Sequence, residues 1–122
     1  MRGGEVVELM AALNTGHEGG CGTLHANTAA SVPARVEALA LAAGLGREAA
    51  HSQLASALDV VVHLARDGDG RRRVAEVALV GRDPTGLVEC RAALRVGPDG
   101  VLVPDRAARE LLDLLDGAPA RA

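Results

Sequence analysis

The sequence predicts an α/β fold, and three observations support this. Apolar residues recur at helical spacing in three segments of the first half of the chain. The run DVVVHLARD at 59–67 is apolar and β-branched, which is typical of a central strand of a sheet. DGDG at 67–70 is a hairpin-turn sequence that joins this run to a second alternating segment. With 122 residues, the chain forms one domain or part of one.

The chain is predicted to begin with a helix and a short strand. The helix covers 4–14, where apolar residues recur at helical spacing and Glu5 lies in the first turn, a position that the helix dipole favours for an acid. Gly16 supplies its stop. The apolar run from Cys21 to Ala26 is flanked by glycines and predicts a buried strand.

Helices, an antiparallel strand run and a last helix are predicted to follow. The two helices are expected over 31–43, N-capped by Ser31 and ended by Gly44 and Gly46, and over 47–58. The later elements are the strand at 59–67, the turn at 67–70, strands over 73–82 and 87–96, a turn at 98–100, and a helix capped by Asp105 that ends near Asp116.

The composition narrows the possible functions. The sequence contains no Phe, Trp, Tyr, Ile or Lys, so the core has to be built mainly from Leu, Val and Ala. A phosphate-binding P-loop uses a lysine, and this chain has neither a lysine nor the G-x-x-x-x-G-K-[ST] pattern, so it cannot complete such a site alone. A net charge of −3 argues against a general nucleic-acid binder. Two cysteines are too few for a disulfide framework, which favours a cytosolic chain.

TGHEGGCGTLHAN at 15–27 is the candidate functional stretch. As a metal site it resembles H-E-x-x-H, but that signature requires a helix, and each of its four glycines weakens a helix by about 1 kcal/mol relative to Ala. It could also be a polar turn, with His25 a hydrogen-bonded residue at a strand end. A third interpretation places His17 in a glycine loop and His25 at the carboxyl end of a strand, where parallel α/β sheets bind ligands. Both imidazoles would then lie beside a phosphate.

The segment RGGEVVELMAALNTGHEGGCGTLHAN (2–27) resembles the stretch after the Walker B strand in type II/type IV secretion-system ATPases. It is most similar to the branch that serves Flp (Tad) pilus assembly and conjugal transfer. The family has a His box, T-G-H … T-[LIV]-H-[AT]-N, which 15–17 and 23–27 match position by position. ARVEAL (34–39), QLASALDVVVHLAR (53–66) and RRRVAEVALV (71–80) also resemble family segments, so the resemblance covers about residues 2–82.

This resemblance implies that 1–82 are the carboxyl-terminal portion of a RecA-like (P-loop NTPase) motor domain, without its Walker A and Walker B strands. Residues 83–122 would be a strand, turn and helix extension. Such motors are hexamers that hydrolyse ATP with Mg²⁺ to drive secretion or pilus assembly. The implied partners are further copies or full-length ATPase subunits, together with platform proteins of the inner membrane. The implied location is the cytoplasm, peripheral to the inner face of the cell membrane, with no direct nucleic-acid binding.

The resemblance also implies roles for six residues. His17 and His25 would sense the γ-phosphate and couple it to subunit movement, and are the expected catalytic pair. The expected nucleotide-binding residues are Thr15 and Thr23, which would support the histidines by hydrogen bonding, and Arg2 and Glu5, which match the family's R-G-x-E and would brace the end of the Walker B strand. No metal ligand is expected in this chain.

Met1 stands where the family has the Val or Leu that precedes R-G-G-E, and a GTG or TTG codon used as a start would place Met there. We therefore expect a carboxyl-terminal fragment of a longer ATPase, with ATP and Mg²⁺ bound mainly by segments absent from this chain. The chain alone is expected not to hydrolyse ATP. The alternative is a non-catalytic remnant that docks to full-length ATPase subunits as an interaction module.

The remaining reactive residues are given structural roles. His51 is expected on an exposed helix face and His63 in a strand. Cys90 is expected to fill space, and the arginines at 71–73 are expected to be solvated.

Overall fold

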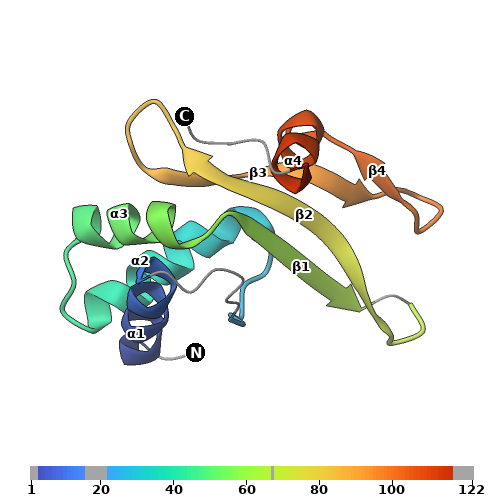
Figure 1. Cartoon of the computed structure of the whole chain (residues 1–122). Helices are drawn as coiled ribbons and strands as arrows, with labels where there is room; N and C mark the ends of the chain where they lie inside the picture. Colours follow the sequence, from blue (N-terminus) through green and yellow to red (C-terminus); the bar gives the residue numbers. More distant parts are fainter. Residues whose placement is uncertain (1–2, 16–21, 67, 117–122) are drawn as a thin grey trace.

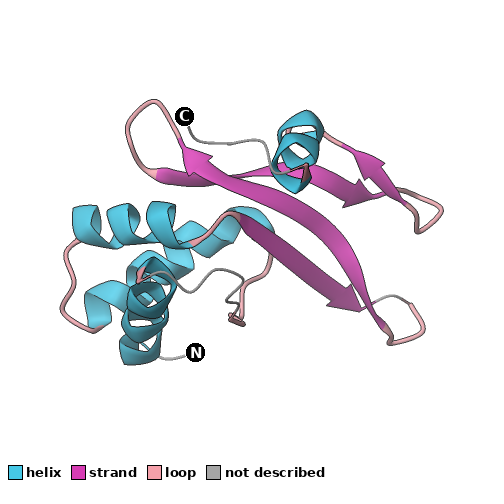
Figure 2. Ribbon diagram, viewed as in Figure 1, coloured by secondary structure: helices cyan, strands magenta, loops and turns pink. Residues whose placement is uncertain are grey.

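The computed structural model describes residues 3–15, 22–66 and 68–116 (Figure 1). These residues form helices and one four-stranded sheet, so the mixed helix and strand content predicted from the sequence is confirmed (Figure 2). In chain order the elements are α1 (Gly3–Asn14), the 3-10 helix η1 (Ala29–Ser31), α2 (Val32–Ala42), α3 (Arg47–Ala57), β1 (Val60–Arg66), β2 (Arg72–Arg82), β3 (Val88–Val96), β4 (Leu102–Pro104) and α4 (Ala108–Leu115).

The sheet is an antiparallel meander in the order β1-β2-β3-β4. The predicted hairpin joins β1 to β2, with Arg66 paired to Arg72 and Gly70 at a φ of 80°, a conformation that a residue with a Cβ rarely adopts. The strands predicted at 73–82 and 87–96 are confirmed as β2 and β3. The short strand β4 was not predicted. The predicted division at residues 82 and 83 falls in the turn between β2 and β3 and stays a prediction.

Helices cover both faces of the sheet. Figure 1 shows α1, α2 and α3 gathered beneath one end of the sheet, whereas α4 lies against the opposite face of β3. Alternation along β3 produces this division, because successive side chains point to opposite faces of a sheet. Val88 and Cys90 pack with the three-helix cluster, and Ala93 packs with Leu111 of α4.

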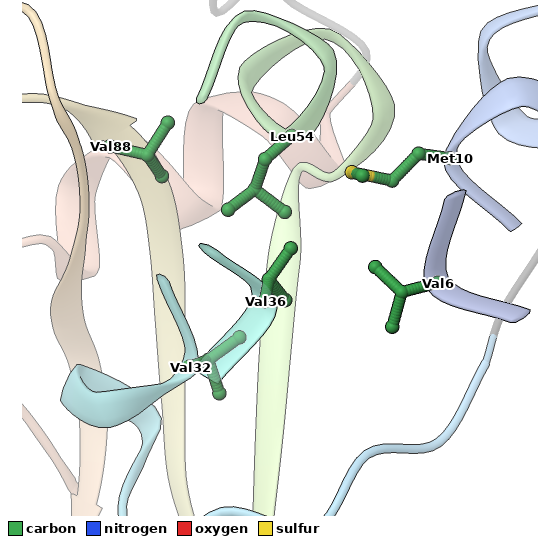
Figure 3. Close-up of a cluster of buried hydrophobic side chains, with 6 residues drawn as sticks. All are labelled: Val6, Met10, Val32, Val36, Leu54 and Val88. Carbon is green, nitrogen blue, oxygen red and sulfur yellow. The ribbon is translucent and has the colours of Figure 1, made fainter. Parts of the chain in front are cut away.

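The main core joins the three helices to β3. It consists of the following buried side chains: Val6 and Met10 of α1, Val32 and Val36 of α2, Leu54 of α3 and Val88 of β3 (Figure 3). Its members are aliphatic, as the absence of aromatic residues from the sequence requires. Partly buried Leu24 and Ala26 pack against it, so the histidine-containing segment is anchored on this core.

The second helix, predicted with an N-cap at Ser31 and an end near residue 43, is confirmed as α2. Thr28 caps η1, the 3-10 helix directly before α2. Its side chain accepts a hydrogen bond from the Ser31 N–H, and the Ser31 hydroxyl oxygen accepts one from the Thr28 N–H. Ser31 occupies the N-cap position of α2, as predicted, but its side chain makes no capping hydrogen bond to that helix and completes the capping box of η1. At the other end Gly44, with a φ of 92°, donates to Leu41 while Leu45 donates to Ala40, the two bonds of a Schellman motif.

The strand at 59–67 was predicted to be central, and this is wrong. In the described sheet β1 lies at an edge and pairs with β2 alone. Its side chains Val62 and Leu64 remain 53% and 50% exposed. A β-branched apolar run indicates an extended backbone, but it carries no information about how many neighbours that strand has.

Two smaller predictions are also wrong. Gly22–Ala26 forms no strand, because the segment pairs with none of the four strands that the described residues form. Asp105 does not cap the last helix. Its carboxylate accepts from the Arg106 N–H at 2.7 Å and pairs with Arg95 at 3.1 Å, while Ala107 occupies the N-cap position.

Candidate functional site

Residues 22–27 precede η1 and alternate between inward and outward side chains. Leu24 and Ala26 point to the core, whereas Thr23, His25 and Asn27 are exposed. Gly22 lies close to α1, since a Cβ at this position would come within 2.5 Å of Leu9 Cδ2. The segment therefore presents every second residue to solvent without being part of a sheet.

His25 lines an open depression of about 570 Å³ between this segment and α2. The depression is lined by His25, Ala26, Asn27, Ser31, Ala34, Arg35 and Ala38. The polar groups are thus an imidazole, an amide, a hydroxyl and a guanidinium, and none of the described lining residues is acidic. Charge and donor groups of this kind favour an anionic ligand.

The other predicted site residues lie elsewhere or outside the described residues. Thr23 is exposed in the same segment, but Thr15 is the residue after α1, where its hydroxyl donates to the Ala12 carbonyl at 3.0 Å. Glu5 is exposed in the first turn of α1. His17 and Arg2 fall outside the described residues. Of the predicted site residues that the structure describes, His25 alone lines the depression.

The expected setting of His25 at the carboxyl end of a parallel strand is not found. The segment that carries it is not a strand, and the sheet of the described residues is antiparallel throughout. A depression beside α2 replaces the strand end as the setting of this histidine.

Arg35 was not predicted as a site residue. It lies one turn after Ser31 on the exposed side of α2, and within the described part of the chain it forms no hydrogen bond or ion pair. The signal for it in the sequence is the four-residue spacing from Ser31, which places both side chains on one face of a helix.

A buried polar cluster fixes α2 from its other side. His51 of α3 was expected to be exposed, but only 6% of its surface is accessible, so that prediction is wrong. Its Nδ1 accepts the Val88 N–H at 2.9 Å, which leaves the proton on Nε2, 2.8 Å from the Glu37 carboxylate. His51 thereby connects α3 to α2 and β3. Burial is tolerated because both ring nitrogens have partners.

Glu37 is the centre of this cluster. Its Oε1 also accepts from Arg47 Nε at 2.8 Å. The hydrogen bond from His51 and then that from Arg47 hold the pKa of the Glu37 carboxyl below its usual value of 4.5.

The other reactive side chains show no grouping of the metal-binding kind. In residues 3–15, 22–66 and 68–116, no three His, Cys, Asp or Glu side chains lie where they could hold a metal ion. The stretch that suggested such a site, from His17 to Cys21, lies outside those residues. Cys90 is half-buried, and burial raises the pKa of its thiol to about 11, with smaller contributions from Glu76 and Glu89.

Comparison with known protein families shows to which family this chain belongs. The family model described as type II/IV secretion system protein matches residues 1–111. The chain belongs to this family. The resemblance inferred from the His box is thereby confirmed at the family level.

Individual members of the family are also similar to this chain. A putative conjugal transfer protein of Mycobacterium tuberculosis (strain H37Rv) is 60% identical over 89 residues, which are 73% of this chain and 25% of that protein. The probable conjugal transfer protein TrbB of Sinorhizobium fredii is 36% identical over 89 residues, 73% of this chain and 26% of its own length. The conjugal transfer protein TrbB of Rhizobium radiobacter is 39% identical over 72 residues, which are 59% of this chain and 22% of that protein.

The chain therefore spans about a quarter of the length of the curated relatives that it matches. Among its described helices, none is long and apolar enough to cross a membrane.

Proposed function

We propose that this chain is the carboxyl-terminal portion of a RecA-like motor domain in a hexameric secretion ATPase. The motor couples ATP hydrolysis to protein secretion, pilus assembly or conjugal transfer. Membership of the type II/IV secretion system family supports this proposal, as do the relatives named conjugal transfer proteins.

The observation that carries the proposal is that His25 is exposed and lines the depression beside α2. Leu24 and Ala26 anchor the second half of the His box on the core, so that Thr23 and His25 face outward. His25 opens onto a depression whose described lining contains no acidic residue. An imidazole in this setting can donate to a phosphate oxygen or orient the attacking water.

Each residue of the His box has a part in this proposal. His17 and His25 contact the γ-phosphate and transmit its presence, Thr23 supports them, and Thr15 ends the preceding helix. Arg2 and Glu5 brace the strand that carries the Walker B acid. ATP and Mg²⁺ are held mainly by segments outside this chain, because its sequence has no lysine and no P-loop pattern.

The proposed assembly is a ring of copies or of full-length subunits at the inner face of the cell membrane, in contact with platform proteins of the secretion machinery. No nucleic acid is part of this proposal. Segments outside the matched quarter of the relatives' length would complete the nucleotide site.

ATP hydrolysis by the native polypeptide tests the proposal. The polypeptide is isolated from source cells with an antibody against residues 31–66, and phosphate release is measured for the wild type and for His25→Ala. We expect hydrolysis by the wild type and a decrease of about 10²–10³-fold in kcat for His25→Ala, typical of the loss of a donor to a developing charge. His63→Ala is the control, since His63 lies in β1 outside the depression.

Two results would contradict the proposal. Absence of hydrolysis by the native polypeptide, together with its co-purification with full-length ATPase subunits, would support the interaction module instead. Equal kcat values for the wild type and His25→Ala would remove the histidine from the mechanism.

A further inference from the structure

Arg35 has no partner for its positive charge in the described part of the chain. It lines the depression with His25, and among the described residues no carboxylate, carbonyl or hydroxyl accepts its hydrogen bonds. Three other arginines have carboxylate partners: Arg47 pairs with Glu37, Arg91 with Glu110 and Arg95 with Asp105. An arginine that is held on a helix and left unpaired beside a histidine has its full set of donors available for a ligand.

The acid closest to Arg35 in the sequence cannot neutralise it. Glu37 is the only acidic residue of α2, and it turns to the other side of the helix, where His51 and Arg47 share its Oε1. The same two contacts keep the pKa of Glu37 low, so that it stays ionised and bound to these partners. Among the residues that the structure describes, the depression therefore keeps the positive charge of Arg35.

The surroundings of Arg35 allow close approach of a ligand. Ala34 and Ala38 contribute only methyl groups to the lining, and Asn27 and Ser31 add neutral polar groups next to His25. A guanidinium has a planar fork of donors that matches two oxygens of a phosphate. An imidazole N–H can contact a third oxygen of the same group.

We propose that Arg35 binds phosphate oxygens of the nucleotide in the depression that it shares with His25. Arg35 supplies the positive charge there, and His25 supplies the second contact. This inference rests on the proposed function, since it assigns a further phosphate-contacting residue to the same site. It concerns binding by residues of this chain alone, so it can be tested without hydrolysis.

Binding of inorganic tripolyphosphate to the 122-residue chain provides the test. The chain is titrated at constant ionic strength, with sodium sulfate as the reference anion, and the NMR signals of the His25 ring and the Arg35 side chain are followed. We expect tripolyphosphate to shift both sets of signals well beyond the sulfate reference. Arg35→Gln is expected to weaken binding at least about tenfold, as the loss of charge-assisted hydrogen bonds predicts.

Two further variants separate geometry from charge. Arg35→Lys keeps the charge but loses the fork, so we expect binding of intermediate strength. Arg109→Gln is the matched control, because Arg109 is exposed on α4, does not line the depression and has no hydrogen bond or ion pair in the described residues. Its tripolyphosphate affinity should equal that of the wild type.

The outcomes distinguish this inference from the proposed function. Equal affinity of Arg35→Gln and the wild type would overturn the role of Arg35, as would shifts no larger than those with sulfate. Neither result would affect hydrolysis by the native polypeptide, which is tested through His25→Ala. Unchanged tripolyphosphate binding with an altered oligomeric state of Arg35→Gln would also overturn the inference, because it would assign Arg35 to a contact between subunits.

Discussion

Replacement of His51 by alanine should destabilise the whole chain, because this residue connects three elements. The change removes the acceptor of the Val88 N–H, which lies at the start of β3 in the core. It also removes the Nε2 donor to Glu37 and leaves a space between α2 and α3. The main loss is the unpaired N–H, since a buried donor has no access to water in compensation.

The size of the effect follows from these contacts. A buried donor without a partner costs about 1–3 kcal/mol. Loss of the packed imidazole adds about 1 kcal/mol, below the range for large apolar side chains. We expect no further contribution from Glu37, because water can reach its carboxylate once His51 is gone. The free energy of unfolding should fall by about 2–4 kcal/mol, which lowers Tm by roughly 10 °C for a domain of this size.

Far-UV circular dichroism is the appropriate assay, since the sequence contains neither Trp nor Tyr. Thermal and urea unfolding are compared for the wild type, His51→Ala and His51→Asn. The amide oxygen of His51→Asn can take the place of Nδ1, so this variant should recover part of the loss. His63→Ala is the matched control and should change the stability by less than about 1 kcal/mol. Equal stabilities of His51→Ala and His63→Ala would refute the reasoning.

Substitutions of Glu37 and Gly44 should each change the stability of the folded chain. The pKa of Glu37 is lower in the folded chain, so its stabilising effect is present above its ordinary value of 4.5 and is lost as the pH falls through the folded value. The Tm of the wild type should therefore be higher than that of Glu37→Gln at neutral pH, and the two Tm values should converge in acid. A difference in Tm that stays constant across pH would contradict this. Gly44→Ala should cost about 1–2 kcal/mol in urea unfolding, because Gly44 has a φ of 92°. Gly4→Ala is its control, since Gly4 has open space around its Cα in α1, and a similar loss there would argue against a backbone cause.

Local sequence patterns predicted most elements, because those elements depend on local properties. Helical spacing of apolar residues and terminal glycines placed α1, α2 and α3 within a few residues, and the DGDG turn placed the hairpin. The failures involve contacts between distant residues. The edge position of β1 depends on which strands pair, and Gly22–Ala26 lacks a strand partner, a fact that composition alone does not contain.

The candidate site was predicted in part for the same reason. The His box identified His25 by its motif, but Arg35 became a candidate only once α2 and the preceding segment were seen to enclose one depression. His51 was misplaced because helix periodicity treats a histidine as polar. Partners in two other elements, Glu37 and Val88, make its burial possible, and they are 14 and 37 residues away in the sequence.

The position of His51 has a mechanical consequence for the depression. Arg35 and Glu37 are two residues apart on α2, and through His51 the second is bound to α3 and to the first residue of β3. A displacement of α2 that brings Arg35 closer to a ligand must either move α3 and β3 with it or break both of these hydrogen bonds. Under small forces α2, α3 and the sheet therefore move together. A larger movement of α2 requires the hydrogen bonds of the His51 imidazole to break.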